Sequence, residues 1–198
     1  VFEVIDKTFP YDSVHFDGKN IIEHRRVHNL YGQSYEKTAF ESLKLRYKNT
    51  RPFVLSRSTY LGSQQFGFHW TGDNTANWDH IKLSLELHTT LAFCGMNNVG
   101  SDVGGFNNNP SQELLAFWYE VGVFYPFFRG HSNMNTIRRE PWRFSKDTFL
   151  RIRNAITLRY NLILFFYTEV YIANQTGRPH IKPYLSSDHL YSYGDTFV

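Results

Sequence analysis

The chain has 198 residues, of which 20% are charged, and its formal net charge of +3 is too small to mark it for nucleic acid or a membrane surface. This length suffices for one well-buried domain but is short for two, and no apolar run is long enough to cross a bilayer. A single cysteine, Cys94, excludes an internal disulfide and a metal cage built from cysteines.

The first predicted elements are a loop, a helix and a strand. Residues 1–22 show little periodicity and carry two turn signals, so we predict a loop region there. Residues 23–48 place apolar side chains on one helical stripe, which predicts a helix. Arg51-Pro52 stops that helix, and residues 53–57 form a short apolar run ending in polar residues, which is typical of a buried parallel strand.

Two strand–helix units are predicted in the middle of the chain. The first has a strand over 66–70, a tight Gly-Asp-Asn break, and an amphipathic helix from Thr75 that Gly95 ends. The second opens with a strand over 96–99, which leads into a glycine-rich loop over 100–106.

The last predicted elements begin with a helix start at residues 109–112, where Asn is the cap, Pro is the first helical residue and Gln lies three residues after the cap. This helix runs to about Val121 and is followed by a fourth strand over 122–128. After an arginine-rich loop, Ser145 caps a single long helix that Gly177 terminates.

The order of these elements predicts the fold class. Strands separated by helices favour parallel pairing with crossover helices. Four strand–helix units are half of an eight-fold α/β barrel, which typically needs about 250 residues. A doubly wound open sheet is the structural alternative, but no Gly-x-Gly-x-x-Gly turn follows a strand, which argues against a dinucleotide site. We predict an α/β fold, the C-terminal half of a (β/α)8 TIM barrel, with no cofactor.

Four polar side chains follow the four predicted strands, one at or just after each strand end. They are Arg57, Asp73, Asp102 and His131. Because adjacent strand ends of a barrel converge on one mouth, we expect them around a common pocket. Each residue alone also fits a purely structural role. Asp73 fits a turn or a helix cap, and Asp102 fits a turn beside glycines. His131 fits a loop histidine, and Arg57 an ordinary ion pair.

Two aromatic residues, Trp70 and Phe106, flank the aspartates of this set. Aromatic residues make up 18% of the chain, an excess that suits either a packed core or walls that stack on sugar rings. The pair His24 and His28 suggests a metal, but no further ligand at helical spacing supports one. We therefore predict no metal site.

Several segments resemble motifs of glycoside hydrolase family 31, and they occur in the same order. Residues 70–80, WTGDNTANWDH, closely resemble its acid/base segment, and residues 51–59, RPFVLSRST, are similar to the strand segment just upstream. Residues 23–32 are similar to the helix entry of the glucosidase II α-subunit and neutral α-glucosidase branch. Later family segments are matched by residues 102–106, 125–131 and 138–142.

The resemblance implies a hydrolase, a retaining α-glucosidase that releases terminal α-linked glucose, on a (β/α)8 barrel. It implies glucose trimming of N-glycans in the endoplasmic reticulum lumen. The implied partners are a glycan substrate and a possible non-catalytic β-subunit, with no nucleic acid and no membrane. Under the resemblance Asp73 is the general acid/base. The implied hydroxyl-binding residues are Arg57, Asp102 and His131, and the implied aromatic walls are Trp70 and Phe106.

The sequence departs from the family pattern at one group that the mechanism requires, the nucleophile. A retaining mechanism needs a nucleophilic carboxylate about 5–5.5 Å from the acid/base, and the family holds it in a Trp-x-Asp-Met-Asn-Glu-Pro segment that this sequence lacks. Val1-Phe2 resembles the two residues after that segment, so we expect a fragment that is inactive alone. Residues 1–198 would be a partial catalytic barrel domain, with 1–22 as its loop region and 181–198 as a truncated exit. The alternative is a non-catalytic remnant that binds carbohydrate or a partner.

Overall fold

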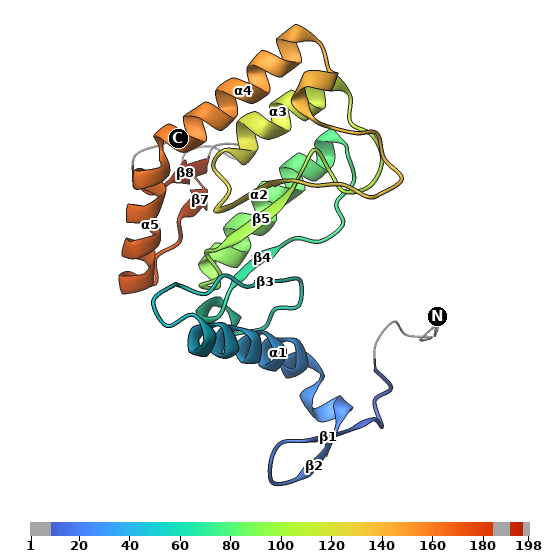
Figure 1. Ribbon diagram of the computed structural model, residues 1–198, viewed down its shortest axis with the longest axis vertical. Helices are drawn as coiled ribbons and strands as arrows, with labels where there is room; N and C mark the ends of the chain where they lie inside the picture. The colour runs from blue at the N-terminus through green and yellow to red at the C-terminus, as the bar shows by residue number, and fades with distance from the viewer. Residues whose placement is uncertain (1–8, 184–190, 196–198) are drawn as a thin grey trace. The chain divides into compact units, whose positions relative to one another are not determined.

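The computed structural model describes residues 9–183 and 191–195. The chain falls into two units, Val1–Gly67 and Phe68–Val198. Figure 1 labels their helices and strands in chain order. Among the described residues, no helix is long and apolar enough to span a membrane.

The first unit opens with an antiparallel hairpin of β1 (Val14–Phe16) and β2 (Ile21–Glu23). Asp17 stabilises the connecting turn, because its Oδ1 accepts a hydrogen bond from the backbone N–H of Asn20 at 2.7 Å. The turn was predicted, but the prediction of a loop throughout 1–22 is wrong for these two strands. Each strand has only three residues, which is too few to show an alternating pattern.

The predicted first helix is confirmed as α1 (His24–Arg46). The residues buried along it are His24 and Glu36, whereas Leu30, which lies on the predicted apolar stripe, is 42% exposed. The apolar stripe is therefore not the buried side of α1 in this unit. The unit is completed by β3 (Leu55–Ser56), shorter than predicted, and the 3-10 turn η1 (Ser63–Gln65).

The second unit is built around three parallel strands, β4 (Phe68–Trp70), β5 (Val99–Val103) and β6 (Phe127–Gly130), which pair in that order. α2 (Trp78–Phe93) connects the first two strands, and α3 (Gln112–Gly122) connects the next two (Figure 1). This is the alternation of parallel strands and crossover helices that the sequence predicted.

The hydrophobic core of this unit lies between the sheet and its helices. Val103 of β5 packs with Ile81 of α2 and Trp118 of α3, and all three are buried. Ser101, two residues earlier on β5, also faces α2, where it hydrogen-bonds a histidine. Because side chains alternate along a strand, Asp102 between them faces the other side of the sheet.

The third and fourth strands begin later than predicted. The prediction for 96–99 stopped too early because Gly100 was interpreted as loop. A side chain at Gly100 would overlap the carbonyl oxygen of Phe127, so close strand pairing requires glycine inside β5. The prediction for 122–128 started too early, because Gly122 is still part of α3 and lets that helix approach β5 closely.

The start of α3 also differs from the prediction. The capping residue is Ser111, whose hydroxyl accepts a hydrogen bond from the backbone N–H of Leu114 at 3.1 Å. Asn109, the predicted cap, instead accepts a hydrogen bond from the backbone N–H of Ile137 at 2.9 Å. Asn109 therefore ties two loops together rather than starting the helix.

The predicted long helix is two helices, α4 (Lys146–Asn161) and α5 (Ile163–Thr176), separated at Leu162, whose ψ of 7° leaves the helical range. Ser145 caps α4 as predicted, with its hydroxyl accepting a backbone hydrogen bond of 3.3 Å. Gly177, with φ of 73°, ends α5 as predicted. The apolar repeat continues through the break, so periodicity alone did not reveal it.

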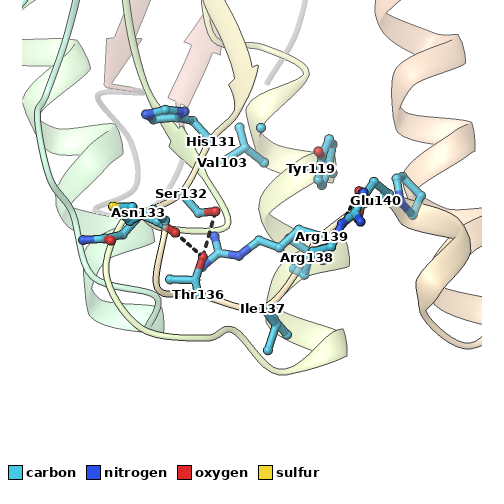
Figure 2. Close-up of a pocket in the computed structure, with 14 residues that line it drawn as sticks. Val103, Tyr119, His131, Ser132, Asn133, Thr136, Ile137, Arg138, Arg139 and Glu140 are labelled. Carbon is cyan, nitrogen blue, oxygen red and sulfur yellow. Dashed lines mark hydrogen bonds and ion pairs between the residues drawn. The ribbon is translucent and has the colours of Figure 1, made fainter.

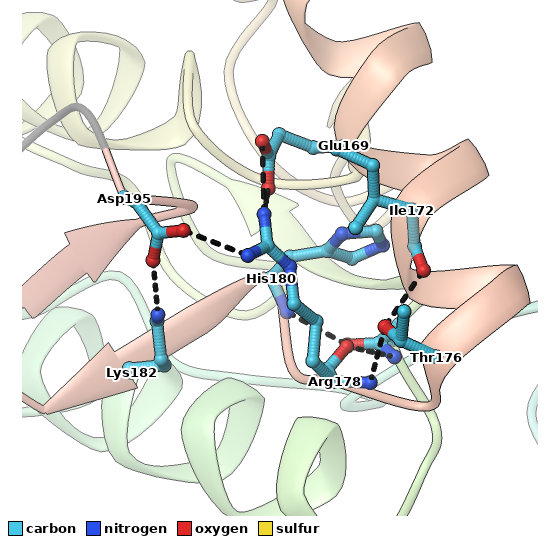
Figure 3. Close-up of polar contacts among 8 residues, drawn as sticks. Glu169, Ile172, Thr176, Arg178, His180, Lys182 and Asp195 are labelled. Atoms are coloured by element: carbon cyan, nitrogen blue, oxygen red, sulfur yellow. Dashed lines mark hydrogen bonds and ion pairs between the residues drawn. The ribbon is translucent and has the colours of Figure 1, made fainter.

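The described part of the C-terminal region forms an antiparallel pair, β7 (Ile181–Pro183) and β8 (Tyr191–Tyr193). An ion network joins this pair to α5 (Figure 3). Arg178 pairs with Glu169 at 3.0 Å and with Asp195 at 2.7 Å. Within the predicted exit region, 181–198, the described residue Asp195 is thus linked to the last helix through Arg178.

Candidate active site

The sheet face that points away from α2 and α3 carries an ion pair between two neighbouring strands. Asp102 and Arg129 lie opposite each other in the β5–β6 register, and Arg129 Nη2 donates a hydrogen bond to Asp102 Oδ1 at 2.7 Å. Asp102 is fully buried, whereas 28% of the Arg129 side chain is exposed. The guanidinium also lies 5.4 Å from the ring centre of Trp70 and 5.1 Å from that of Phe127. Aromatic faces at this range stabilise a cation.

Arg129 is a site residue that the sequence analysis did not single out. The predicted strand ended at residue 128, which placed Arg129 in a loop. In the structure Phe127 and Arg129 are two residues apart on β6, so they share one face. The other carboxylate oxygen of Asp102, Oδ2, is buried and has no hydrogen-bond partner within the described part of the chain.

Asp73 lies in the loop between β4 and α2, and its side chain is exposed. The predicted helix start at Thr75 is wrong, because α2 begins at Trp78. Its cap is Asn77, whose side chain accepts a backbone hydrogen bond of 2.8 Å. The interpretation of Asp73 as a helix cap is therefore wrong. Gly72, with φ of 84°, makes the turn that leads into Asp73.

The loop that carries Asp73 is paired with the loop after β5. The backbone N–H groups of Phe106 and Asn107 both donate to the carbonyl oxygen of Asn74, at 2.7 and 3.0 Å. In return, the backbone N–H of Ala76 donates to the Asn107 carbonyl at 2.9 Å. Gly105, with φ of 79°, permits this approach, since a Cβ there would lie 2.5 Å from the Ala76 backbone. The loop pairing holds the Asp73 segment beside the segment that carries Phe106.

Phe106 and His131 lie together at the ends of β5 and β6. Their ring centres are 5.5 Å apart and their planes are inclined by 30°. The backbone N–H of Asn133 donates to the Phe106 carbonyl at 2.9 Å, which links the two loops. His131 follows β6 directly and is exposed. The structure thus brings a flat aromatic ring next to an exposed imidazole.

Arg57 belongs to the first unit, where it directly follows β3 and is exposed. Nearby, Ser56 Oγ donates to the Ser58 carbonyl at 2.8 Å, which shapes the chain on both sides of Arg57. The candidate site described here is therefore built from the second unit alone: Asp73, Trp70, Asp102, Phe106 and His131, together with Arg129.

A cavity of about 510 Å³ lies next to this site, under the loop that follows β6 (Figure 2). Its lining includes His131, Asn133 and Arg139, and on the α3 side Tyr119. Burial raises the pKa of the Tyr119 phenol, so Tyr119 keeps its proton near neutral pH. The loop then passes through the 3-10 turn η2 (Pro141–Arg143) into α4.

The two histidines that suggested a metal hydrogen-bond each other instead. His24 Nε2 and His28 Nδ1 are 2.9 Å apart, and His15 Nε2 lies 2.9 Å from His24 Nδ1. Both ring nitrogens of His24 are thus engaged within the protein. In the ranges that the structure describes, no group of three or more His, Cys, Asp or Glu side chains is placed to hold a metal ion.

Comparison with known proteins gives a family match over most of the chain. The model of the glycosyl hydrolases family 31 TIM-barrel domain matches residues 2–169. A probable glucan 1,3-alpha-glucosidase of Arabidopsis thaliana is 45% identical over 92% of this chain and 20% of its own length. Neutral alpha-glucosidase AB of Mus musculus is 45% identical over 92% of this chain and 19% of its own length. This chain therefore spans about a fifth of the length of these relatives.

Solved structures match the fold as well as the sequence. The glucosidase II alpha subunit in its Glc1Man2-bound form superposes with a TM-score of 0.83 at 39% identity, covering 88% of this chain and 20% of that one. A second match is the ER glucosidase II heterodimeric complex, which consists of a catalytic subunit and the binding domain of a regulatory subunit. It superposes with a TM-score of 0.78 at 42% identity, covering 81% of this chain and 18% of that one. The predicted fold class, an α/β part of a TIM barrel, is confirmed by these matches and by the parallel strands.

Proposed function

The chain belongs to glycosyl hydrolase family 31, and on that premise we propose that it supplies the acid/base part of an α-glucosidase active site. The observation that carries this proposal is the pairing of the β4–α2 and β5–α3 loops, which holds Asp73 beside Phe106 at the ends of adjacent parallel strands. Catalytic groups of barrel enzymes lie at these strand ends. Phe106 in turn contacts His131, so three successive strands contribute to one mouth.

In this proposal Asp73 protonates the glycosidic oxygen while the bond between that oxygen and the sugar C1 breaks and a nucleophilic carboxylate bonds to C1. The Asp73 carboxylate then takes a proton from a water whose oxygen attacks C1, which breaks the bond to the nucleophile and releases glucose. An exposed side chain on a loop held by backbone hydrogen bonds suits this exchange of protons with substrate and water. The nucleophile is assigned to sequence outside these 198 residues, because the family's nucleophile segment does not occur in them.

The proposal gives the other candidates distinct roles. His131 donates a hydrogen bond to a sugar hydroxyl, and Phe106 supplies an apolar wall. For Arg57, in the first unit, the sugar-binding role is proposed on the family resemblance alone. Asp102 is fully buried and bonded to Arg129, so we assign it to orienting that guanidinium. Trp70, whose ring lies under the Arg129 guanidinium, completes the apolar wall that Phe106 begins.

We further propose a glycan substrate with terminal α-linked glucose, an endoplasmic reticulum location and a non-catalytic β-subunit as partner. Support comes from solved structures of the glucosidase II alpha subunit with Glc1Man2 bound and with alpha3-Glc2 bound, and from the ER glucosidase II heterodimer that contains the binding domain of a regulatory subunit. These properties belong to longer proteins, and this chain matches about a fifth of their length.

The test is hydrolysis of p-nitrophenyl α-glucoside and of an α-1,3-linked glucose disaccharide by the protein expressed with the sequence that flanks this chain in its gene. The wild type should release glucose, and Asp73→Asn should lose about 10²–10⁴-fold in kcat/KM on the disaccharide, the range for a lost general acid. Asp79→Asn, an exposed aspartate in the first turn of α2, is the matched control and should retain wild-type kinetics. Wild-type rates in Asp73→Asn would overturn the assignment.

The second candidate function, a non-catalytic carbohydrate-binding remnant, is favoured by the missing nucleophile segment. We expect the 198-residue chain by itself to show no turnover of p-nitrophenyl α-glucoside. Glucose or maltose binding by this chain that Arg57→Ala abolishes would support the remnant. Turnover by the isolated chain would contradict both this candidate and the assignment of the nucleophile to flanking sequence.

A further inference from the structure

The loop after β5 turns several backbone carbonyls toward one point. Three of its residues have positive φ: Gly104 (89°), Gly105 (79°) and Asn108 (66°). The guanidinium of Arg139, from the loop after β6, binds the carbonyls of all three. Nη1 donates to Gly104 at 2.9 Å and to Gly105 at 2.5 Å, and Nη2 donates to Asn108 at 2.5 Å. A planar, permanently charged group with several donors suits such a cluster of carbonyl dipoles.

The same loop is the one that pairs with the acid/base segment. Between the carbonyls that Arg139 binds lie Phe106 and Asn107, whose N–H groups both donate to the Asn74 carbonyl, next to Asp73. Arg139 therefore holds one side of the loop while the Asp73 segment is bonded to the other side. A shift of the loop would move the Asn74 carbonyl and with it the position of the Asp73 carboxyl.

The contacts of Arg139 differ from those of the neighbouring arginine. Arg138 pairs with Glu140 at 2.6 Å, and 73% of its side chain is exposed, so it contributes an ordinary surface ion pair. Arg139 is partly buried, its Nε is buried without a hydrogen-bond partner among the described residues, and its Nη donors contact backbone carbonyls. Burial lowers the pKa of the Arg139 guanidinium below its ordinary value, while charge interactions with Tyr119 and Asp102 act in the opposite direction. The three carbonyl contacts stabilise the buried cation.

We propose that Arg139 is a positioning residue for the acid/base Asp73, acting through the loop from Gly104 to Asn108. This inference rests on the proposed function of Asp73, which it deepens. Arg139 itself does not contact substrate or reacting atoms. Its effect is expected on the step that needs proton donation, and not on the binding of sugar as such.

The kinetic test compares two substrates with different needs for a proton donor, in the protein expressed with its flanking sequence. An α-1,3-linked glucose disaccharide has a poor leaving group, whereas α-glucosyl fluoride loses fluoride with little help from an acid. Arg139→Met should reduce kcat/KM on the disaccharide by about 10²-fold, the loss typical of a catalytic group displaced by an ångström, and should largely spare the fluoride. Arg139→Lys should be intermediate, because one ammonium cannot reproduce the guanidinium fork. Arg138→Met is the matched control and should behave as wild type.

Hydrogen exchange supplies a readout that does not depend on activity. In Arg139→Met the backbone amides of Phe106, Asn107 and Ala76, which bridge the two loops, should exchange faster than in wild type or Arg138→Met. Unchanged exchange, or equal losses on both substrates, would overturn the inference; if Arg139→Met does not fold, Arg139→Lys decides it by the same criteria. If the wild type hydrolyses neither substrate, the proposed function fails, while the exchange result still decides whether Arg139 holds the loops.

Discussion

The two faces of the β4–β5–β6 sheet both bury polar side chains, but of different kinds. The helix-side face, which packs against α2 and α3, holds a neutral chain of His88, Ser101 and Thr71. His88 Nε2 lies 2.9 Å from Ser101 Oγ, which lies 2.7 Å from Thr71 Oγ1. The opposite face, here called the site face, holds the ion pair of Asp102 and Arg129.

This difference fits a stabilising role for the helix-side face and the proposed binding role for the site face. Burial lowers the pKa of His88 to about 4, so His88 is neutral near pH 7 and joins α2 to β5 as an uncharged hydrogen-bonding group. On the site face Arg129 keeps 28% of its side chain exposed and lies close to the rings of Trp70 and Phe127. An ion pair is a costly way to stabilise a sheet, so its presence at the strand ends fits ligand binding better than packing.

Removal of Arg129 should cause the largest loss of stability, because it leaves the fully buried Asp102 carboxylate without the cation that hydrogen-bonds to it. Arg129→Met should lower the free energy of unfolding by about 3–5 kcal/mol, measured by urea denaturation at neutral pH. The double variant Asp102→Asn/Arg129→Met should recover part of this loss, since no uncompensated carboxylate remains. A double variant no more stable than Arg129→Met would show that the ion pair is not the source of the loss.

On the helix-side face, His88 should make stability depend on pH. Its pKa is about 4 in the folded protein and 6.5 as an ordinary histidine, so the unfolded chain binds more protons between these values. The free energy of unfolding should therefore fall as the pH decreases from about 6.5 to about 4, by on the order of 3 kcal/mol. His180, whose pKa burial also lowers to about 4, acts in the same direction.

The measurement is urea denaturation near pH 7 and near pH 4. His88→Gln should lose less stability between the two conditions than the wild type, and His88→Gln/His180→Gln should lose less again. If His88→Gln shows the full wild-type loss, the neutral chain on the helix-side face is not what titrates.

At the strand ends, the pairing of the loop after β4 with the loop after β5 depends on Gly105. Gly105→Ala should lower the free energy of unfolding by about 1–3 kcal/mol, since it adds a strained backbone conformation and a Cβ that lies 2.5 Å from Ala76. It should also reduce disaccharide hydrolysis by displacing the Asp73 segment. Gly177→Ala is the control: its φ of 73° has the same sign, but nothing lies within 4 Å of the added carbon. A control as destabilised as Gly105→Ala would show that strain alone, and not loop contact, sets the effect.

Much of the fold could be predicted from the sequence, because periodicity and helix-end signals are local. α1, the cap at Ser145 and the end at Gly177 all follow from such signals, and the strand–helix order led to the parallel sheet. The errors arose where a local signal had a non-local cause. Gly100 marks a close approach of β6 and not a loop, and the break at Leu162 lies inside an unbroken apolar repeat.

The candidate site shows the same limit. The rule that polar residues at parallel strand ends share one mouth predicted a common pocket for Arg57, Asp73, Asp102 and His131, and this stays a prediction. The structure places Asp73 after β4 and His131 after β6, the strands on either side of β5. Arg129 and Arg139 were not singled out, because their partners are a strand register and a set of carbonyls that only the folded chain brings together. The catalytic and sugar-binding roles themselves stay predictions.

The smallest expected change in stability concerns ion pairs away from both faces of the sheet. It tests whether solvent exposure decides how much an ion pair contributes to stability. Arg178 pairs with two carboxylates: Glu169, with 8% of its side chain exposed, and Asp195, with 67% exposed (Figure 3). Asp195→Asn should lower Tm only slightly, and the difference should vanish at high salt, because exposed pairs are weak and screened. Glu169→Gln removes the buried partner of the same arginine and should lower Tm clearly more, at low and high salt alike. Equal shifts in the two variants would mean that burial does not separate the two pairs, and would weaken the same argument for Asp102 on the site face.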